Sequence, residues 1–336
     1  MMKAVFVFAA LPLLAQTVDV QQTIREGIAL YDQRRYDEAI AKYKTVLAQE
    51  PSNVDAVYEL GYTYQTKGDA AACIALLTPW SDKPTTQQSA LRTILANCLD
   101  NAGRRDEAIA LYRKTLEVEP NHPQLLYNLA LTLSSGGDSE LDEARALLKK
   151  ELSAIRPNHA SARYLLGRIF EVQQFRVPAI LEYLRFLAIE PNGPRAKEAA
   201  TRMLTLLNLG VEKKGRNTNV TIDSNPRKEE GDYSTWAMML AIASAARDLP
   251  EKPKRTDFER TRAQLYSTLM MFVESGPEGH ADYTATANFP FFAELQQRKL
   301  LEALSGAALL SLDLKGEDEW LKKNEKEVGE LAAFTH

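Results

Sequence analysis

Small residues recur through the first 191 residues of this 336-residue chain in pairs that lie twelve positions apart. Three of these pairs are followed by a tyrosine four residues later, and by a proline twelve residues after the second small residue, as at Tyr43 and Pro51. Chance rarely aligns three spacings, so the chain is built from a repeated unit. The pairs are Gly27 and Ala39, Gly61 and Cys73, Ala96 and Ala108, and Gly167 and Ala179.

Each unit is predicted to be a pair of antiparallel helices. Two helices approach closely where small residues meet, and glycine, alanine and cysteine supply such contacts. A residue four positions further on lies on the same helix face, so Tyr43, Tyr112 and Tyr183 are expected to fill the adjoining space. Proline ends the second helix, because it disfavours a helical conformation in the residue before it. The pattern predicts an all-α solenoid of helical hairpins.

This pattern resembles the tetratricopeptide repeat (TPR), whose period is about 34 residues. We count five repeats in an array that spans residues 20–191, with irregular features at residues 78–80 and 139–141. The resemblance implies a TPR-type solenoid, but this fold says little about the partner. It is carried by Gly27, Tyr36, Ala39, Tyr43, Pro51, Leu60, Gly61, Tyr64, Gly68, Cys73, Leu95, Ala96, Gly103, Ala108, Tyr112, Pro120, Leu129, Ala130, Gly137, Ala144, Pro157, Leu166, Gly167, Phe170, Ala179, Tyr183 and Pro191.

The N-terminal residues 1–16 are typical of a secretory signal peptide. Lys3 precedes an apolar run, residues 4–14, which is too short for an ordinary membrane span. We therefore expect a periplasmic or secreted protein with no membrane span after signal cleavage. An uncleaved anchor is the alternative, because Leu13 occupies a position where a signal peptidase prefers a small residue.

The remainder of the chain is predicted to hold a capping helix at residues 192–209, a linker at 210–232 and a small helical domain at 233–336. Polar residues of the capping helix, Arg195 among them, suit the outer side of the array. The C-terminal domain lacks the repeat pattern. Its helices are expected at residues 233–247, 257–274, 290–312 and 317–333, with loops at 248–254 and 276–288. The phenylalanines around Phe291 form core or dock this domain against the array.

Cys73 and Cys98 are the only cysteines of the chain. They fall on helices expected to be neighbours, and an exported protein meets an oxidising compartment, so a disulfide is one interpretation. The sequence favours the other, in which both are buried thiols that act as small apolar residues.

The candidate binding surface is the concave face, which the first helix of each hairpin lines in the TPR family. Tyrosines and amides at these positions suit a peptide or a partner helix, although each tyrosine could instead pack between helices. In TPR domains that bind a chaperone's C-terminal tail, lysines hold the carboxylate of the tail. This chain has Ala90, Thr93 and Ile94 in that neighbourhood, which argues against a chaperone tail as the ligand. The projected residues are Tyr58, Tyr62, Gln65, Asn97, Tyr127, Asn128, Leu131, Tyr164 and Arg168.

No catalytic, metal or cofactor constellation stands out. The net charge of −4 argues against a nucleic-acid partner. His122 and His159 fall in equivalent turns between repeats, while His280, near Glu278 and Asp282, lacks the paired spacing of a zinc enzyme.

We therefore expect a non-enzymatic, exported scaffold that binds a protein or peptide partner. One alternative is an enzyme or small-ligand binder that acts through its C-terminal domain, with the repeats as a targeting module. Another is a self-assembling structural protein.

Overall fold

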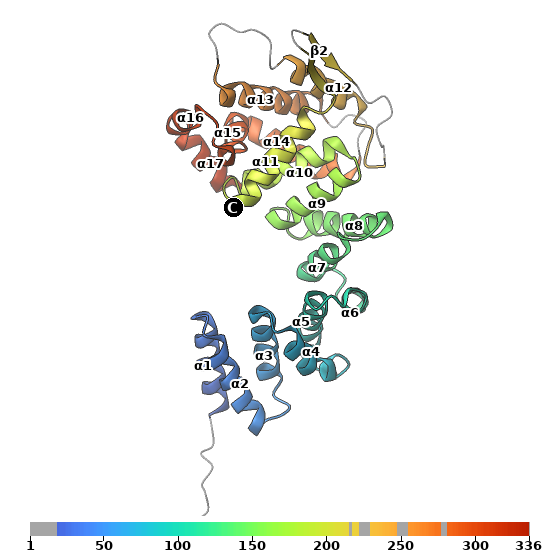
Figure 1. Ribbon diagram of the computed structural model, residues 1–336, viewed down its shortest axis with the longest axis vertical. Coiled ribbons are helices and arrows are strands. Elements are labelled where there is room, and N and C mark those ends of the chain that lie inside the picture. Colours follow the sequence, from blue (N-terminus) through green and yellow to red (C-terminus); the bar gives the residue numbers. More distant parts are fainter. Residues whose placement is uncertain (1–18, 215–216, 222–228, 247–254, 277–280, 336) are drawn as a thin grey trace, which may run out of the picture. The chain divides into compact units, whose positions relative to one another are not determined.

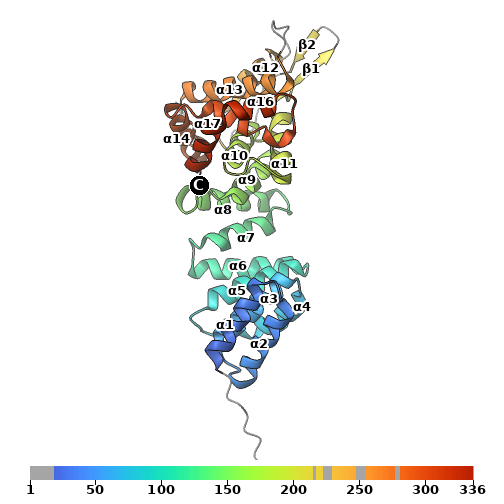
Figure 2. The same cartoon turned by 90° about the vertical axis from the view of Figure 1, so that its left-hand side faces the viewer.

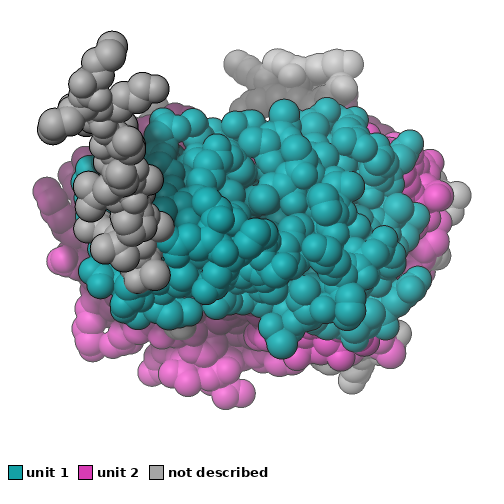
Figure 3. All heavy atoms as spheres, turned by 90° about the horizontal axis from the view of Figure 1, so that it is seen from below, with its two compact units in different colours: residues 1–119 teal, residues 120–336 magenta. Residues whose placement is uncertain are grey.

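The structure, a computed structural model, describes residues 19–214, 217–221, 229–246, 255–276 and 281–335 (Figure 1). The predicted signal peptide, residues 1–16, lies outside the described residues. The chain divides into two compact units, Met1–Glu119 and Pro120–His336, which Figure 3 shows in teal and magenta. The boundary falls within the predicted array, and each unit is described by itself below.

The first unit consists of three antiparallel helical hairpins, as the repeat spacing predicts (Figures 1 and 2). In the first two hairpins a glycine of the first helix faces a large side chain of the second, Tyr43 opposite Gly27 and Leu77 opposite Gly61. A Cβ atom on Gly61 would lie 3.0 Å from Cδ1 of Leu77. The elements are α1 (Val20–Asp32), α2 (Tyr36–Gln49), α3 (Val54–Lys67), α4 (Ala70–Leu77), the 3-10 helix η1 (Thr78–Trp80), α5 (Gln88–Asn101) and α6 (Arg105–Val118).

Replacing Gly27 with alanine tests this packing. The added Cβ would lie 2.5 Å from Cε1 of Tyr43, so this fully buried ring would have to shift within the core. We expect a loss of about 1–3 kcal/mol in the free energy of unfolding, measured by urea denaturation. The control is Gly329→Ala in the last helix, where nothing lies within 4 Å of the added atom. An equal effect of the two changes would contradict the packing argument.

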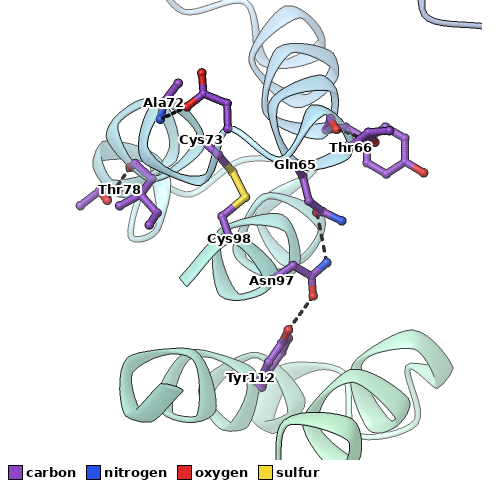
Figure 4. The surroundings of a disulfide bond; sticks show 11 residues. Gln65, Thr66, Ala72, Cys73, Thr78, Asn97, Cys98 and Tyr112 are labelled. Atoms are coloured by element: carbon purple, nitrogen blue, oxygen red, sulfur yellow. Dashed lines mark hydrogen bonds between the residues drawn. A yellow bond between two sulfur atoms is a disulfide. The ribbon is translucent and has the colours of Figure 1, made fainter. Parts of the chain in front are cut away.

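Cys73 and Cys98 form a disulfide that joins α4 to α5 (Figure 4). The interpretation as two buried thiols was wrong. The two helices are packing neighbours, and the Cα atoms of the cysteines are 6.3 Å apart, which is within the reach of a disulfide.

The second unit adds further helical hairpins and surrounds the last of them with the C-terminal helices. Of the 14 residues of α10 (Arg176–Ile189), 12 are buried, because α12, α14, α15 and α17 also contact this helix (Figures 1 and 2). The other elements are α7 (Pro123–Leu133), α8 (Asp138–Ala154), α9 (Ala160–Val172), α11 (Pro194–Leu207), β1 (Val211–Lys214), β2 (Asn217–Val220), α12 (Ser234–Ala246), α13 (Asp257–Ser275), α14 (Tyr283–Gln297), α15 (Leu301–Ala307), the 3-10 helix η2 (Leu310–Leu312), α16 (Glu317–Lys323) and α17 (Glu325–Thr335).

Two sequence-based boundaries in this unit were wrong. The helix expected at residues 290–312 begins earlier, at Tyr283, because Asp282 caps it by accepting a hydrogen bond of 3.0 Å from the backbone N–H of Ala285. Pro290 therefore lies inside α14. The helix ends before Lys299, whose φ of 61° is incompatible with a continuing helix.

In the predicted linker, β1 and β2 pair as an antiparallel hairpin.

A buried polar network fastens α14 to α9 and α10. Arg163 donates a hydrogen bond of 2.7 Å to Glu182 Oε2, and Asn288 donates one of 3.0 Å to Glu182 Oε1. Arg185 donates to the carbonyl of Ala287 and lies 3.9 Å from the ring centroid of Phe291. The phenylalanine cluster thus contributes to docking of the C-terminal helices, one of its two predicted roles.

Among the described residues, no helix combines the length and the apolar character needed to cross a membrane.

Candidate functional site

Two of the predicted residues, Tyr58 and Tyr62, form an aromatic strip on the first unit. They lie one turn apart on α3 with parallel rings, whose centroids are 6.2 Å apart. Tyr31, near the end of α1, extends the strip, because its ring centroid is 5.6 Å from that of Tyr62 and its hydroxyl is 3.0 Å from Oγ1 of Thr66. Tyr62 is 39% exposed. The rings therefore join α1 to α3 and also reach solvent.

Gln65 and Asn97, in contrast, are bonded to neighbouring helices (Figure 4). Asn97 donates a hydrogen bond of 3.1 Å to Gln65 Oε1 and accepts one of 2.5 Å from the hydroxyl of Tyr112. The amide thus bridges α3, α5 and α6. These hydrogen bonds align the hairpins. They also leave fewer hydrogen-bonding groups of each amide available to a partner's backbone than the sequence suggested.

The second unit has an open hollow between α7, α9 and α11 with a volume of about 340 Å³. Four predicted residues line it: Tyr127, Leu131, Tyr164 and Arg168. Leu131 is 46% exposed and Val172 is 62% exposed, so the hollow offers apolar surface to solvent. We call it the α7–α9 hollow. Its remaining lining residues are Ser134, Leu141, Ser161, Leu165, Ile169, Val172 and Arg195.

The two arginines of the hollow are held by carboxylates. Arg168 donates a hydrogen bond of 3.2 Å to Glu198, while Arg195 donates one of 3.1 Å to Glu190 and one of 3.0 Å to Ser161. Hydrogen bonds from Tyr164 and Arg202 lower the pKa of Glu198, so it is ionised at neutral pH. The polar edge of the hollow therefore carries charges of both signs, held in fixed positions.

Tyr127 and Tyr164 form the aromatic part of the hollow. The ring of Tyr127 meets the ring of His159 edge-on, with 4.9 Å between centroids, and burial raises the pKa of its hydroxyl. Tyr164 packs against Phe186, with 5.2 Å between ring centroids. Each ring is thus half-buried and oriented before a partner arrives. Asn128, by comparison, accepts a hydrogen bond of 2.7 Å from Gln124 on its own helix and does not line the hollow.

Arg195 was not among the predicted binding residues, although a signal for it exists. It lies 34 residues after Ser161, which itself lies 34 residues after Tyr127, and all three line the hollow. Continuing the repeat period into the capping helix would have identified it. Its side chain faces the hollow, whereas the sequence argument had placed it on the outer side of the array.

The described residues include no group of three or more histidine, cysteine, aspartate or glutamate side chains placed to hold a metal ion. His122 caps α7, since its Nδ1 accepts a hydrogen bond of 3.3 Å from the backbone N–H of Leu125. His159 Nδ1 lies 2.7 Å from Oε1 of the buried Glu151. His280 lies outside the described residues.

Three family models match parts of the chain: a TPR repeat model at residues 27–68, and two tetratricopeptide repeat models at residues 90–124 and 111–146. Together they cover segments from both compact units.

Among characterised proteins, the chain is 29% identical over 157 residues to tetratricopeptide repeat protein 21A of Mus musculus, which is 46% of this chain and 11% of that protein. It is 26% identical over 134 residues to cellulose synthase 2 operon protein C of Komagataeibacter xylinus, covering 39% of this chain and 10% of that protein. The chain thus spans about a tenth of the length of these relatives. A solved thermophilic TPR protein of Thermus thermophilus aligns with a TM-score of 0.44 and 20% identity, over 56% of this chain and 100% of its own.

Proposed function

We propose, from the premise that this chain is a tetratricopeptide repeat protein, that it is an exported, non-enzymatic scaffold that holds a protein partner in the α7–α9 hollow. TPR proteins bind protein partners, and the hollow is the surface of the second unit that best suits this role. The observation that carries the proposal is the exposure of Leu131 and Val172 beside two half-buried tyrosines. Apolar side chains of a partner would bury this surface, and tyrosines lose little rotamer freedom on binding.

The fixed charges at the edge of the hollow would give the interaction its orientation. Arg168 and Arg195 are each held by a carboxylate, so their guanidinium groups occupy defined positions in the free protein. A partner's polar groups then meet an ordered rim around an apolar centre, the usual arrangement of a specific interface.

Export is the other part of the proposal. It is supported by the apolar run in residues 4–14 and by the disulfide between Cys73 and Cys98, since stable disulfides are typical of oxidising compartments. The state of these cysteines in cells tests it, as argued in the Discussion.

An enzyme or small-ligand binder built on the C-terminal helices has weaker support. The cavity between α10, α12 and α13 has a volume of about 30 Å³, roughly the space of one water molecule, and its lining includes Leu181, Trp236 and Phe272. This cavity is a packing defect of the core and offers little to orient a substrate.

A photo-crosslinking amino acid in place of Leu131 tests the binding surface. In an envelope extract of the source organism, we expect this protein to form a discrete adduct with one partner. The same amino acid in place of Val118, which is 69% exposed on the first unit, is the matched control and should not form that adduct.

The variant Tyr127→Ala with Arg168→Glu should weaken capture of that partner at least about tenfold, because truncation of buried aromatic and arginine anchors is costly. Leu131→Asp with Val172→Asp should do the same at two exposed positions, and an unchanged melting temperature of this variant separates loss of binding from loss of folding. The same adduct at both crosslinking positions, or an adduct that survives both double variants, would reject the hollow as the binding surface.

A further inference from the structure

The acidic side chains beside the aromatic strip lack the ion pairs that most carboxylates of the first unit make. Most carboxylates of this unit are paired or cap a helix; Glu26, for example, lies 2.6 Å from Lys42, and Asp37 lies 2.5 Å from Lys67. Asp32 at the end of α1 and Glu59 on α3 have no ion-pair partner among the described residues. Asp32 and Glu59 lie close enough for the charge of Asp32 to act on Glu59, so a positively charged ligand beside them would relieve this repulsion.

These carboxylates adjoin the aromatic strip. Asp55, Glu59 and Tyr62 follow one another along α3 at intervals of four and three residues, so they share one side of the helix. Asp32 directly follows Tyr31, whose ring contacts Tyr62. We call this surface the anionic tyrosine face, formed by Tyr31, Asp32, Asp55, Tyr58, Glu59 and Tyr62.

Local electrostatics show that the negative charge of this face is concentrated. Burial, together with the charges of Asp55 and Asp32, raises the pKa of Glu59. The C-terminal end of a helix carries partial negative charge, and the last turn of α1, where Asp32 lies, contains no basic residue to balance it. Tyr43 is fully buried nearby, and the charges of Glu59 and Asp32 add to burial in raising the pKa of its hydroxyl.

We infer that the anionic tyrosine face binds a basic peptide segment of a protein partner, whose arginine or lysine side chains lie over the rings of Tyr58 and Tyr62 and pair with Glu59 and Asp32. Parallel tyrosine rings present electron-rich faces to a cation, and the carboxylates supply the opposite charge at the edge of the rings. A metal ion is a poorer occupant, because these carboxylates are not among any described group placed to hold one.

This inference rests on the proposed scaffold function, which it extends to a second surface and a chemical class of partner. Because the α7–α9 hollow belongs to the other compact unit, the two surfaces are tested separately. The hollow variants should leave binding at the anionic tyrosine face unchanged.

The test measures fluorescence anisotropy of a labelled peptide of alternating arginine and alanine residues, added to the full mature chain at low salt. A peptide of alternating glutamate and alanine residues is the reference probe. We expect the arginine peptide to bind and the glutamate peptide to bind at least about tenfold more weakly, as complementary charge requires.

Asp32→Asn with Glu59→Gln should weaken arginine-peptide binding at least about tenfold, and Tyr62→Ala should weaken it without a change in charge. Asp106→Asn with Glu117→Gln is the matched control: it removes the same two charges from exposed positions on α6 of the same unit, and neither carboxylate makes an ion pair among the described residues. This control should change affinity less than about twofold.

Two results would overturn the inference: equal binding of the two peptides, or equal losses of affinity in the Asp32→Asn with Glu59→Gln variant and in the control variant. The Asp32→Asn with Glu59→Gln variant should unfold at the same temperature as the wild type or higher, because it removes repulsion. A loss of affinity accompanied by a lower melting temperature would therefore count against a binding role. If the arginine peptide binds as expected but the variants of the α7–α9 hollow still capture their partner, only the proposal of the hollow as a binding surface is rejected.

Discussion

Replacing Glu182 with alanine is expected to lower the free energy of unfolding of the second unit by about 3–5 kcal/mol. Glu182 is fully buried and its two oxygens accept hydrogen bonds from Arg163 and Asn288. Arg185 is also buried nearby. Burial and the positive charge of Arg163 lower the pKa of Arg185 to about 9, so it is still protonated at neutral pH. Without Glu182, two buried guanidinium groups would have no adjacent carboxylate, which is why the expected effect is large.

The measurement is urea denaturation followed by the fluorescence of Trp236 and Trp320, which both lie in the second unit, with Trp80 of the first unit replaced by phenylalanine in every variant. Glu294→Ala is the control, since it removes an exposed pair with Arg298 one turn away and should cost less than about 0.5 kcal/mol. Glu182→Gln keeps the shape and should fall between the two. A Glu182→Ala effect as small as that of the control would mean that the network contributes little to docking of the C-terminal helices.

The repeat architecture could be predicted from sequence because it depends on local spacing. Gly27, Gly61 and Gly167 each meet the side chain that the repeat places opposite them, Tyr43, Leu77 and Tyr183. A helix period and a small residue are enough to specify such a contact. The prediction of an all-α TPR solenoid is therefore confirmed over the described residues, with β1 and β2 as the only strands there.

The C-terminal helices were harder to predict because long-range packing decides their limits. Pro290 marked a helix start in the sequence, yet tertiary contacts keep α14 helical on both sides of it, and Asp282 provides the cap. The partners of Arg163 and Arg185 are also remote in sequence: Asn288 is 125 residues from Arg163, and Ala287 is 102 residues from Arg185. Periodicity carries no information about such pairs.

The candidate site was predicted in part, because spacing specifies which residues share a face but not how their side chains are oriented. Tyr127, Leu131, Tyr164 and Arg168 lie around one hollow because residues that share a repeat position share a face. Asn97 and Gln65 lie at comparable positions, but their amides bond to each other, which depends on side-chain orientation and not on spacing. Arg195 was missed because the array was taken to end at residue 191, whereas α11 continues its geometry.

Replacing both Cys73 and Cys98 with alanine is expected to destabilise the first unit by about 2–4 kcal/mol, since the disulfide closes a chain segment of 25 residues and restricts the unfolded state. Because the bond joins α4 to α5, the loss should be greatest in these helices and in α3, which packs against both. Amide hydrogen exchange resolved by helix measures it. Protection in the second unit serves as the internal reference.

Treatment with a reductant distinguishes the effect of losing the disulfide from the effect of replacing the cysteine side chains. A reductant should lower protection of α4 and α5 in the wild type to the level of the double alanine variant, and it should leave that variant unchanged. The same cysteines report the compartment. Both cysteines are buried, so the cells are lysed in denaturant that contains a thiol-alkylating reagent. The full chain should then not react, while a chain that lacks residues 1–16 should react at both positions, because the cytosol keeps thiols reduced. Equal alkylation of the two chains would show that formation of the disulfide does not depend on residues 1–16. The disulfide would then no longer support export.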